Sequence, residues 1–184
     1  GQGMSGRSME LKWILRALLA LTTLPLVAVG QLDTINSPLT IPLRFSGNFG
    51  EIRTGHFHTG LDIRTDGKEG VPVLAAQSGR IGRVKVSNLG YGRALYLNGQ
   101  GWTTVYAHLS AFHPSVEAWL KEKQYATESW LFDGAPEAVF AFSAGDTIGW
   151  SGNSGRSFGP HLHFEVRDQR TQWPINPLHW VMRG

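Results

Sequence analysis

From residue 56 onward, polar and apolar residues alternate along much of this chain, which is the pattern of strands with one buried face. In the stretch 56–63 the even positions hold His, His, Gly and Asp, whereas the odd positions hold Phe, Thr, Leu and Ile. The same reasoning predicts further strands over 71–76, 80–86, 93–97, 102–109, 147–150 and 161–166. Asn98-Gly99 predicts a hairpin, and 23 glycines supply turns. The sequence therefore predicts a mainly β fold.

One segment departs from this pattern. Residues 114–128 have the spacing of a short amphipathic helix, and they lie within an apparent insertion at about 112–143. The insertion is rich in aromatic residues: Phe112, Trp119, Tyr125, Trp130, Phe132, Phe140 and Phe142. Two interpretations stay open. The aromatic residues form a local core around the helix, or they form one wall of a substrate groove beside His108.

The first 30 residues have the pattern of a secretory signal. Lys12 and Arg16 precede the apolar run 17–27, and Ala28 and Gly30 are small residues suited to cleavage. An uncleaved membrane anchor is the alternative. With residues 1–30 set apart, 31–184 form a single predicted domain, and no stable membrane span is expected after cleavage.

The charge balance gives no sign of a nucleic-acid surface. The segment 1–30 holds three basic residues and one acidic residue, so its removal lowers the formal net charge from +3 to +1. We therefore expect no nucleic-acid partner.

Histidines gather in three of the predicted strands. The first segment holds His56, His58 and Asp62, the second holds His108 two residues after Tyr106, and the third holds His161 and His163. Residues two or four apart on a strand share a face. The sequence therefore predicts that His58 shares a face with Asp62, that Tyr106 shares one with His108, and that His161 shares one with His163.

A sheet face lined with histidines and a carboxylate suits zinc. The chain has no Cys, so thiolate ligands, thiol catalysis and disulfides are excluded. Catalytic zinc takes three ligands from His and Asp or Glu and keeps a fourth position for water. Because His161 and His163 share a strand face, alternation alone does not decide which of them is the zinc ligand. His113 and His179 fall outside the pattern and are interpreted as surface residues.

Several motifs of the chain resemble those of the lysostaphin/LytM-type zinc endopeptidases, which are cell-wall peptidases. The similarity extends over about residues 45–178. The motifs occur in the family's order: His58-Thr59-Gly60-Leu61-Asp62, Val71–Ala76, Tyr106-Ala107-His108-Leu109-Ser110, Gly145–Gly149, Ser151–Gly155 and Gly159-Pro160-His161-Leu162-His163-Phe164-Glu165.

The resemblance implies a compact antiparallel β-sheet domain of the duplicated hybrid motif type, with a groove over the sheet. It implies His58, Asp62 and His163 as ligands of one zinc ion per chain. By the same resemblance, His161 is the general base on the zinc-bound water, and His108 orients or stabilises the tetrahedral intermediate.

The resulting hypothesis is an exported zinc metalloendopeptidase that hydrolyses peptide stems or cross-bridges of peptidoglycan, in the periplasm or envelope of a Gram-negative bacterium. Two other functions stay open. One is a non-catalytic module that binds peptidoglycan or activates an amidase, and the other is a zinc peptidase acting on proteins. The sequence indicates no oligomeric state.

Overall fold

The computed structural model describes residues 35–180. The predicted signal segment 1–30 lies outside the described residues. Within 35–180, no helix has the length and apolar character that a membrane crossing requires.

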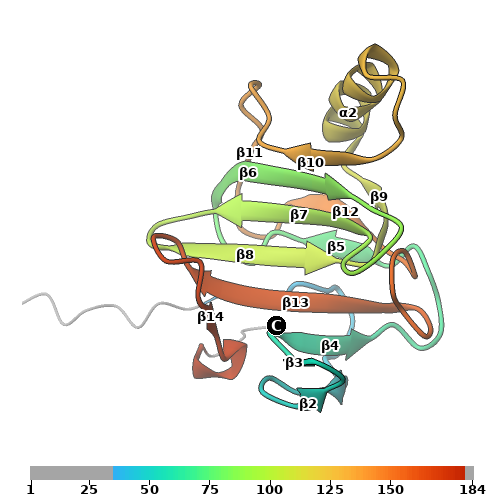
Figure 1. Cartoon of the computed structure of the whole chain (residues 1–184). Helices are drawn as coiled ribbons and strands as arrows, with labels where there is room; N and C mark the ends of the chain where they lie inside the picture. Colours follow the sequence, from blue (N-terminus) through green and yellow to red (C-terminus); the bar gives the residue numbers. More distant parts are fainter. Residues whose placement is uncertain (1–34, 181–184) are drawn as a thin grey trace, which may run out of the picture. The chain divides into compact units, whose positions relative to one another are not determined.

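The described chain is mainly β, with one α-helix (Figure 1). The strands of the first half are β1 (Phe45–Gly47), β2 (Ile52–Arg53), β3 (His56–Phe57), β4 (Leu61–Arg64), β5 (Pro72–Leu74), β6 (Gly79–Val86) and β7 (Arg93–Asn98). The elements that follow are β8 (Trp102–Ala107), β9 (Leu109–Phe112), α2 (Pro114–Ala126), β10 (Phe132–Gly134), β11 (Ala141–Phe142), β12 (Thr147–Ser151), β13 (His161–Asp168), β14 (Pro174–Ile175) and the 3-10 helix η1 (Pro177–His179).

Nine strands form one antiparallel sheet, in the order β1-β4-β13-β8-β7-β6-β10, with β11 also on β6 and β14 on β13. The predicted hairpin at Asn98 joins β7 to β8, and the antiparallel fold expected from the resemblance is confirmed. β13 lies between β4 and β8 (Figure 1). The topology therefore places β13, which carries His161 and His163, between the strand that carries Asp62 and the strand that leads to His108.

A smaller sheet, β5-β12-β9, lies behind the large one in Figure 1. Apolar side chains from both sheets form the main core cluster, with members such as Leu61, Phe164 and Leu162 from the large sheet and Val73 and Ile148 from the small one. These side chains are fully buried. On β4 and β13 the core residues alternate with Asp62, His161 and His163, so the predicted division into a core face and a polar face is confirmed for these strands.

The predicted helix is present as α2 and ends two residues earlier than expected, at Ala126. Its buried side chains are Val116 and Leu120. The remainder of the segment 112–143 supplies β10 and β11, which pair with β6. Trp119 packs edge-to-face against Phe132 and Phe140, and these rings pack against the core cluster.

The expectation of one strand over 56–63 is wrong. The stretch divides into β3, which pairs with β2 in a separate hairpin, and β4, which pairs with β1 and β13. The two strands are separated by residues 58–60, where Gly60 lies against the Phe164 backbone: a Cβ on Gly60 would stand 2.3 Å from the Phe164 carbonyl oxygen. His56 is consequently exposed, whereas His58 is buried.

The expectation of one strand over 102–109, with Tyr106 and His108 on one face, is also wrong. Tyr106 belongs to the main core together with Leu109, and His108 stands between β8 and β9 with a φ of 62°. This left-handed conformation lets the chain leave the large sheet at β8 and join the small sheet at β9. His108 is thereby turned out of the core that holds Tyr106.

Candidate metal centre

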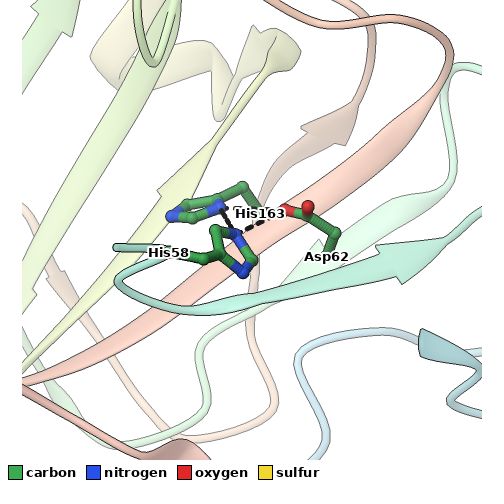
Figure 2. Close-up of side chains that lie close together, drawn as sticks. All are labelled: His58, Asp62 and His163. Atoms are coloured by element: carbon green, nitrogen blue, oxygen red, sulfur yellow. Dashed lines mark hydrogen bonds and ion pairs between the residues drawn. The ribbon is translucent and has the colours of Figure 1, made fainter. Parts of the chain in front are cut away.

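Three side chains meet on the polar face of the large sheet. His58 follows β3, Asp62 lies on β4 and His163 lies on β13, where its Cα is directly opposite that of Asp62. Figure 2 shows the two imidazoles and the carboxylate pointing toward one another. His58 Nε2 is 3.0 Å from Asp62 Oδ1 and 3.0 Å from His163 Nδ1, and the latter two atoms are 2.9 Å apart. All three residues are at most 8% exposed.

The outer nitrogen of each imidazole has an acceptor, which fixes the tautomer. His58 Nδ1 is 2.7 Å from the carbonyl oxygen of Asn48, and His163 Nε2 is 2.8 Å from Glu165 Oε1. Each of these nitrogens donates its N–H outward, so His58 Nε2 and His163 Nδ1 are the ring atoms left to bind a metal ion, once a proton shared with Asp62 has been displaced. Orientation of this kind is usual for metal-binding histidines.

The carboxylate of Asp62 is also oriented by a neighbour. Arg53 Nη2 donates to Asp62 Oδ2 at 3.0 Å and contacts Glu51 as well, so Oδ1 is left for the centre. Burial opposes ionisation of Asp62, but hydrogen bonds from His161, His163 and His58 outweigh it and hold its pKa well below the usual range. Asp62 is therefore an anionic ligand group at neutral pH.

Glu165 is fully buried behind His163 and accepts four hydrogen bonds. The donors are His163 Nε2 at 2.8 Å, Arg167 Nε at 2.6 Å, Thr59 Oγ1 at 2.5 Å and the hydroxyl of Tyr91. Burial raises the pKa of Glu165, but the interactions with His163 and Arg167 outweigh burial and lower it to about 2. The buried carboxylate is thus ionised and holds His163 in place.

The two other predicted site histidines, His108 and His161, lie beside the three. The ring centroids of His108 and His161 are 4.7 Å apart, and His108 is 5.9 Å from His163. His161 Nε2 is 3.5 Å from Asp62 Oδ1. His108 Nδ1 is 2.8 Å from the Ser154 carbonyl oxygen and His161 Nδ1 is 2.8 Å from that of Gly159. Both residues therefore present Nε2 toward the centre.

Protonation differs between the buried imidazoles. Burial disfavours the charged form of His108 and lowers its pKa to about 4, although the hydrogen bond to Ser154 opposes this. Burial acts in the same sense on His163, but the hydrogen bonds to Asp62 and Glu165 outweigh it and raise its pKa to about 9. A cation at the centre must displace that proton, so metal binding and protonation compete.

The donor set fits a metal ion. A tetrahedral ion with ligand bonds of about 2.0–2.1 Å separates its ligand atoms by about 3.3 Å, close to the 2.9–3.0 Å separations found here. Two imidazole nitrogens and one carboxylate oxygen converge, and each ligand group is held from behind by Asn48, Arg53 or Glu165. The three residues His58, Asp62 and His163 can hold one ion.

The structure places the five predicted site residues together and leaves the other histidines outside the centre. His113 caps the N-terminus of α2, His179 is exposed, and His56 contacts the carbonyl of Thr54. The sequence patterns did not indicate the supporting roles of Glu165, Tyr91, Arg53 and Asn48. Of these only Glu165 had a signal, because its position two residues after His163 places it on the same face.

Comparison with known proteins gives consistent matches. The family model described as Peptidase family M23 matches residues 56–128. The DD-carboxypeptidase/endopeptidase Mpg of Neisseria meningitidis serogroup B is 34% identical over 128 residues, which cover 69% of this chain and 23% of the relative. Lysostaphin of Staphylococcus simulans is 33% identical over 113 residues, covering 60% of this chain and 18% of the relative. The chain thus spans about a quarter or less of the length of these relatives.

Solved structures agree with these matches. The catalytic domain of lysostaphin from Staphylococcus simulans superposes with a TM-score of 0.55 at 26% identity, covering 74% of this chain and 90% of that one. Csd3 of Helicobacter pylori gives a TM-score of 0.58 at 28% identity and covers 82% of this chain and 33% of its own.

Proposed function

The chain carries a domain of peptidase family M23, and from that premise we propose that it is a zinc endopeptidase that hydrolyses amide bonds in the peptide stems or cross-bridges of peptidoglycan. The observation that carries this proposal is the convergence of His58, Asp62 and His163 with two further imidazoles beside them. A module that only binds its ligand has no need of the two extra imidazoles. The names of Mpg and lysostaphin favour a cell-wall peptide as substrate.

His58, Asp62 and His163 hold the zinc ion in this proposal. A zinc ion held there would polarise the scissile carbonyl and would lower the pKa of a bound water molecule to about 7. The ligand groups contribute one negative charge in total, from Asp62. Asn48, Arg53 and Glu165 keep the ligand atoms in position, and their contacts exist before any substrate arrives.

His161 is the general base. Its Nδ1–H donates to the Gly159 carbonyl, so that Nε2 carries the lone pair and faces the centre. It takes a proton from the nucleophilic water and delivers it to the leaving amine, which is the usual double role of such a group. Its side chain is 17% exposed, more than that of His163, so substrate can reach it.

His108 has a supporting role. The hydrogen bond to Ser154 leaves its Nε2 as an acceptor, and the low pKa keeps it neutral at physiological pH. In that form it orients a water molecule or an amine N–H, and it donates to the oxyanion only when it carries a proton.

Digestion of purified peptidoglycan, with mass spectrometry of the products, tests the proposal. We expect new amine and carboxyl ends within peptide stems or bridges, no cleavage after chelation, and recovery when zinc is restored. Metal analysis should give one zinc per chain. Active protein without zinc, or cleavage confined to glycan strands, would contradict the proposal.

Export to the periplasm or envelope of a Gram-negative bacterium is part of the same proposal. Removal of residues 9–30 should abolish export, and the exported protein should begin near Gln31. N-terminal sequencing of exported protein checks this, and a retained apolar run at 17–27 would indicate a membrane anchor instead.

A further inference from the structure

An arginine whose guanidinium has no partner within residues 35–180 lies beside His161, on the face of the sheet that carries the metal centre. Arg64 ends β4, and its Cα is directly opposite that of His161 across the β4–β13 pair. It stands two residues after Asp62 and therefore shares the face of Asp62. Side chains directly opposite one another on adjacent strands have Cβ atoms about 4.5–5.5 Å apart. The Arg64 side chain thus starts directly beside that of the proposed base.

The charged groups around Arg64 are already paired with one another. Arg53 binds Asp62 and Glu51, each at 3.0 Å, and Asp66 lies 3.8 Å from Arg44. Among residues 35–180 the guanidinium of Arg64 has neither a hydrogen bond nor an ion pair. It is exposed and keeps its charge, because a guanidinium does not deprotonate in proteins.

Arg64 and His161 border the same hollow. Its volume is about 380 Å³, and Ser46, Asp66 and Phe158 also line it. Phe158 is fully exposed and adds an apolar side chain to the lining. His161 belongs to both the hollow and the centre, since its Nε2 is 3.5 Å from Asp62 Oδ1. A group bound at Arg64 would therefore share this hollow with His161.

Resting on the proposed function, we propose that this hollow is a carboxylate subsite, in which Arg64 binds the carboxylate on the carbon attached to the leaving nitrogen. In the hydrolysis, water adds to the acyl carbon, the C–N bond breaks, and the proton passes through His161 to the amine. The leaving amine consequently lies beside His161, and a carboxylate one carbon away from that amine reaches Arg64. A guanidinium matches a carboxylate with two parallel N–H···O bonds.

Two peptidoglycan groups share this chemistry. In an uncross-linked stem ending in D-Ala-D-Ala, the terminal carboxylate stands on the carbon attached to the scissile nitrogen. In a direct D-Ala–diaminopimelate cross-link, the carboxylate at the D-centre of diaminopimelate has the same place. A peptide bond inside a glycine bridge has no carboxylate there. The subsite thus selects for both of the first two bonds over the third.

The experiment compares each carboxylate substrate with its neutral amide, using the zinc-loaded full chain. The substrates are a D-Ala-D-Ala stem, a D-Ala–diaminopimelate cross-linked dimer, and the form of each in which that one carboxylate is amidated. We expect amidation to lower kcat/KM about 10- to 100-fold, as for loss of a charge-assisted hydrogen bond. If amidation lowers kcat/KM for only one of the two substrates, that substrate is the source of the carboxylate that Arg64 binds.

Arg64→Gln should abolish the difference, cutting acid and amide at the slow rate of the amide while its zinc content stays unchanged. Arg80→Gln is the matched control, because Arg80 is exposed and lies on β6, away from β4; it should keep the full preference. An Arg64→Gln protein that retains the wild-type ratio of acid to amide overturns the subsite.

Binding measurements separate this inference from the proposed function. With the zinc-loaded His161→Ala variant, NMR titration should give a Kd about 10- to 100-fold weaker for the amidated dimer than for the acid. Equal binding of acid and amide overturns the subsite even if the wild type hydrolyses peptidoglycan. If the wild-type protein binds the acid preferentially but does not hydrolyse peptidoglycan, the subsite is upheld and the proposed peptidase activity is refuted.

Discussion

His161 and His163 stand two residues apart on β13 but have different partners, so their removal should have different effects. His163→Ala should lose zinc, because Nδ1 of His163 is one of the three converging ligand atoms. His161→Ala should keep one zinc per chain and lose most turnover, by about 10²–10⁴-fold for loss of a general base. Metal analysis alongside peptidoglycan digestion checks both variants. Equal loss of zinc in the two would refute these role assignments.

Glu165 is a positioning residue, and its effect should appear in metal affinity. Glu165→Gln removes the charge that holds the Nε2–H of His163, so zinc should bind about 10- to 100-fold more weakly. Competition with a chelator of known affinity measures the change.

The same substitution removes the carboxylate that pairs with Arg167, which by itself lowers the melting temperature. Glu165→Gln combined with Arg167→Met should recover the melting temperature and not the zinc affinity. Recovery of both would mean that Glu165 acts only through stability.

At the scale of single residues, the sequence was informative where a side chain alternates regularly on a strand. Asp62, His161 and His163 were predicted on the polar face because β4 and β13 are continuous through them. Arg53 and Tyr91 could not be predicted, because they reach the centre from a separate hairpin and from a loop. Contacts of that kind depend on tertiary folding, and the alternation of side chains along a single strand gives no information about it.

Two glycines hold the loop that supports His108. A Cβ on Gly155 would stand 2.3 Å from the Gly92 nitrogen, and Gly155 has a φ of 72°. Ser154 precedes it, and its carbonyl oxygen receives the Nδ1–H of His108. Gly155→Ala should therefore shift the loop, lower turnover and leave the zinc bound.

The loss of stability from the left-handed φ alone should be about 1–2 kcal/mol, which denaturant unfolding measures. Gly134→Ala is the control for a general glycine effect, because its Cβ would meet only Phe132 at 3.4 Å. A Gly155→Ala protein with normal turnover would show that His108 does not need this loop.

At the scale of elements, the strands were predicted better than their interruptions. The strands β6, β7, β12 and β13 and the helix α2 lie where the sequence predicted them, to within two residues. The breaks at 58–60 and at His108 were missed because nothing local forces them. They arise where the chain passes from one sheet to another, and these are the places from which His58 and His108 reach the centre.

Over the described domain, the metal centre and the segment 112–143 occupy different parts of the large sheet. The ligand groups belong to β4, β13 and the turn before β4, whereas β10 and β11 pair with β6, three strands away from β13. The aromatic rings of Trp119, Phe132 and Phe140 contact one another. These positions favour the local-core interpretation of the insertion over the groove-wall interpretation.

Replacement of residues 113–142 by a short Gly-Ser link should therefore destabilise the protein more than it changes the bond that is cut. Zinc should stay bound, because no ligand lies in that segment. The melting temperature should fall, because Val116 and Leu120 leave the core and β6 loses the partners that cover its edge. Leu120→Ala alone should cost about 2–5 kcal/mol, whereas Glu122→Ala, at an exposed position of α2, should cost almost nothing. Unfolding curves and product analysis of the same samples check the two effects separately. A shortened protein with an unchanged melting temperature and an altered choice of bonds would instead place the insertion in substrate selection.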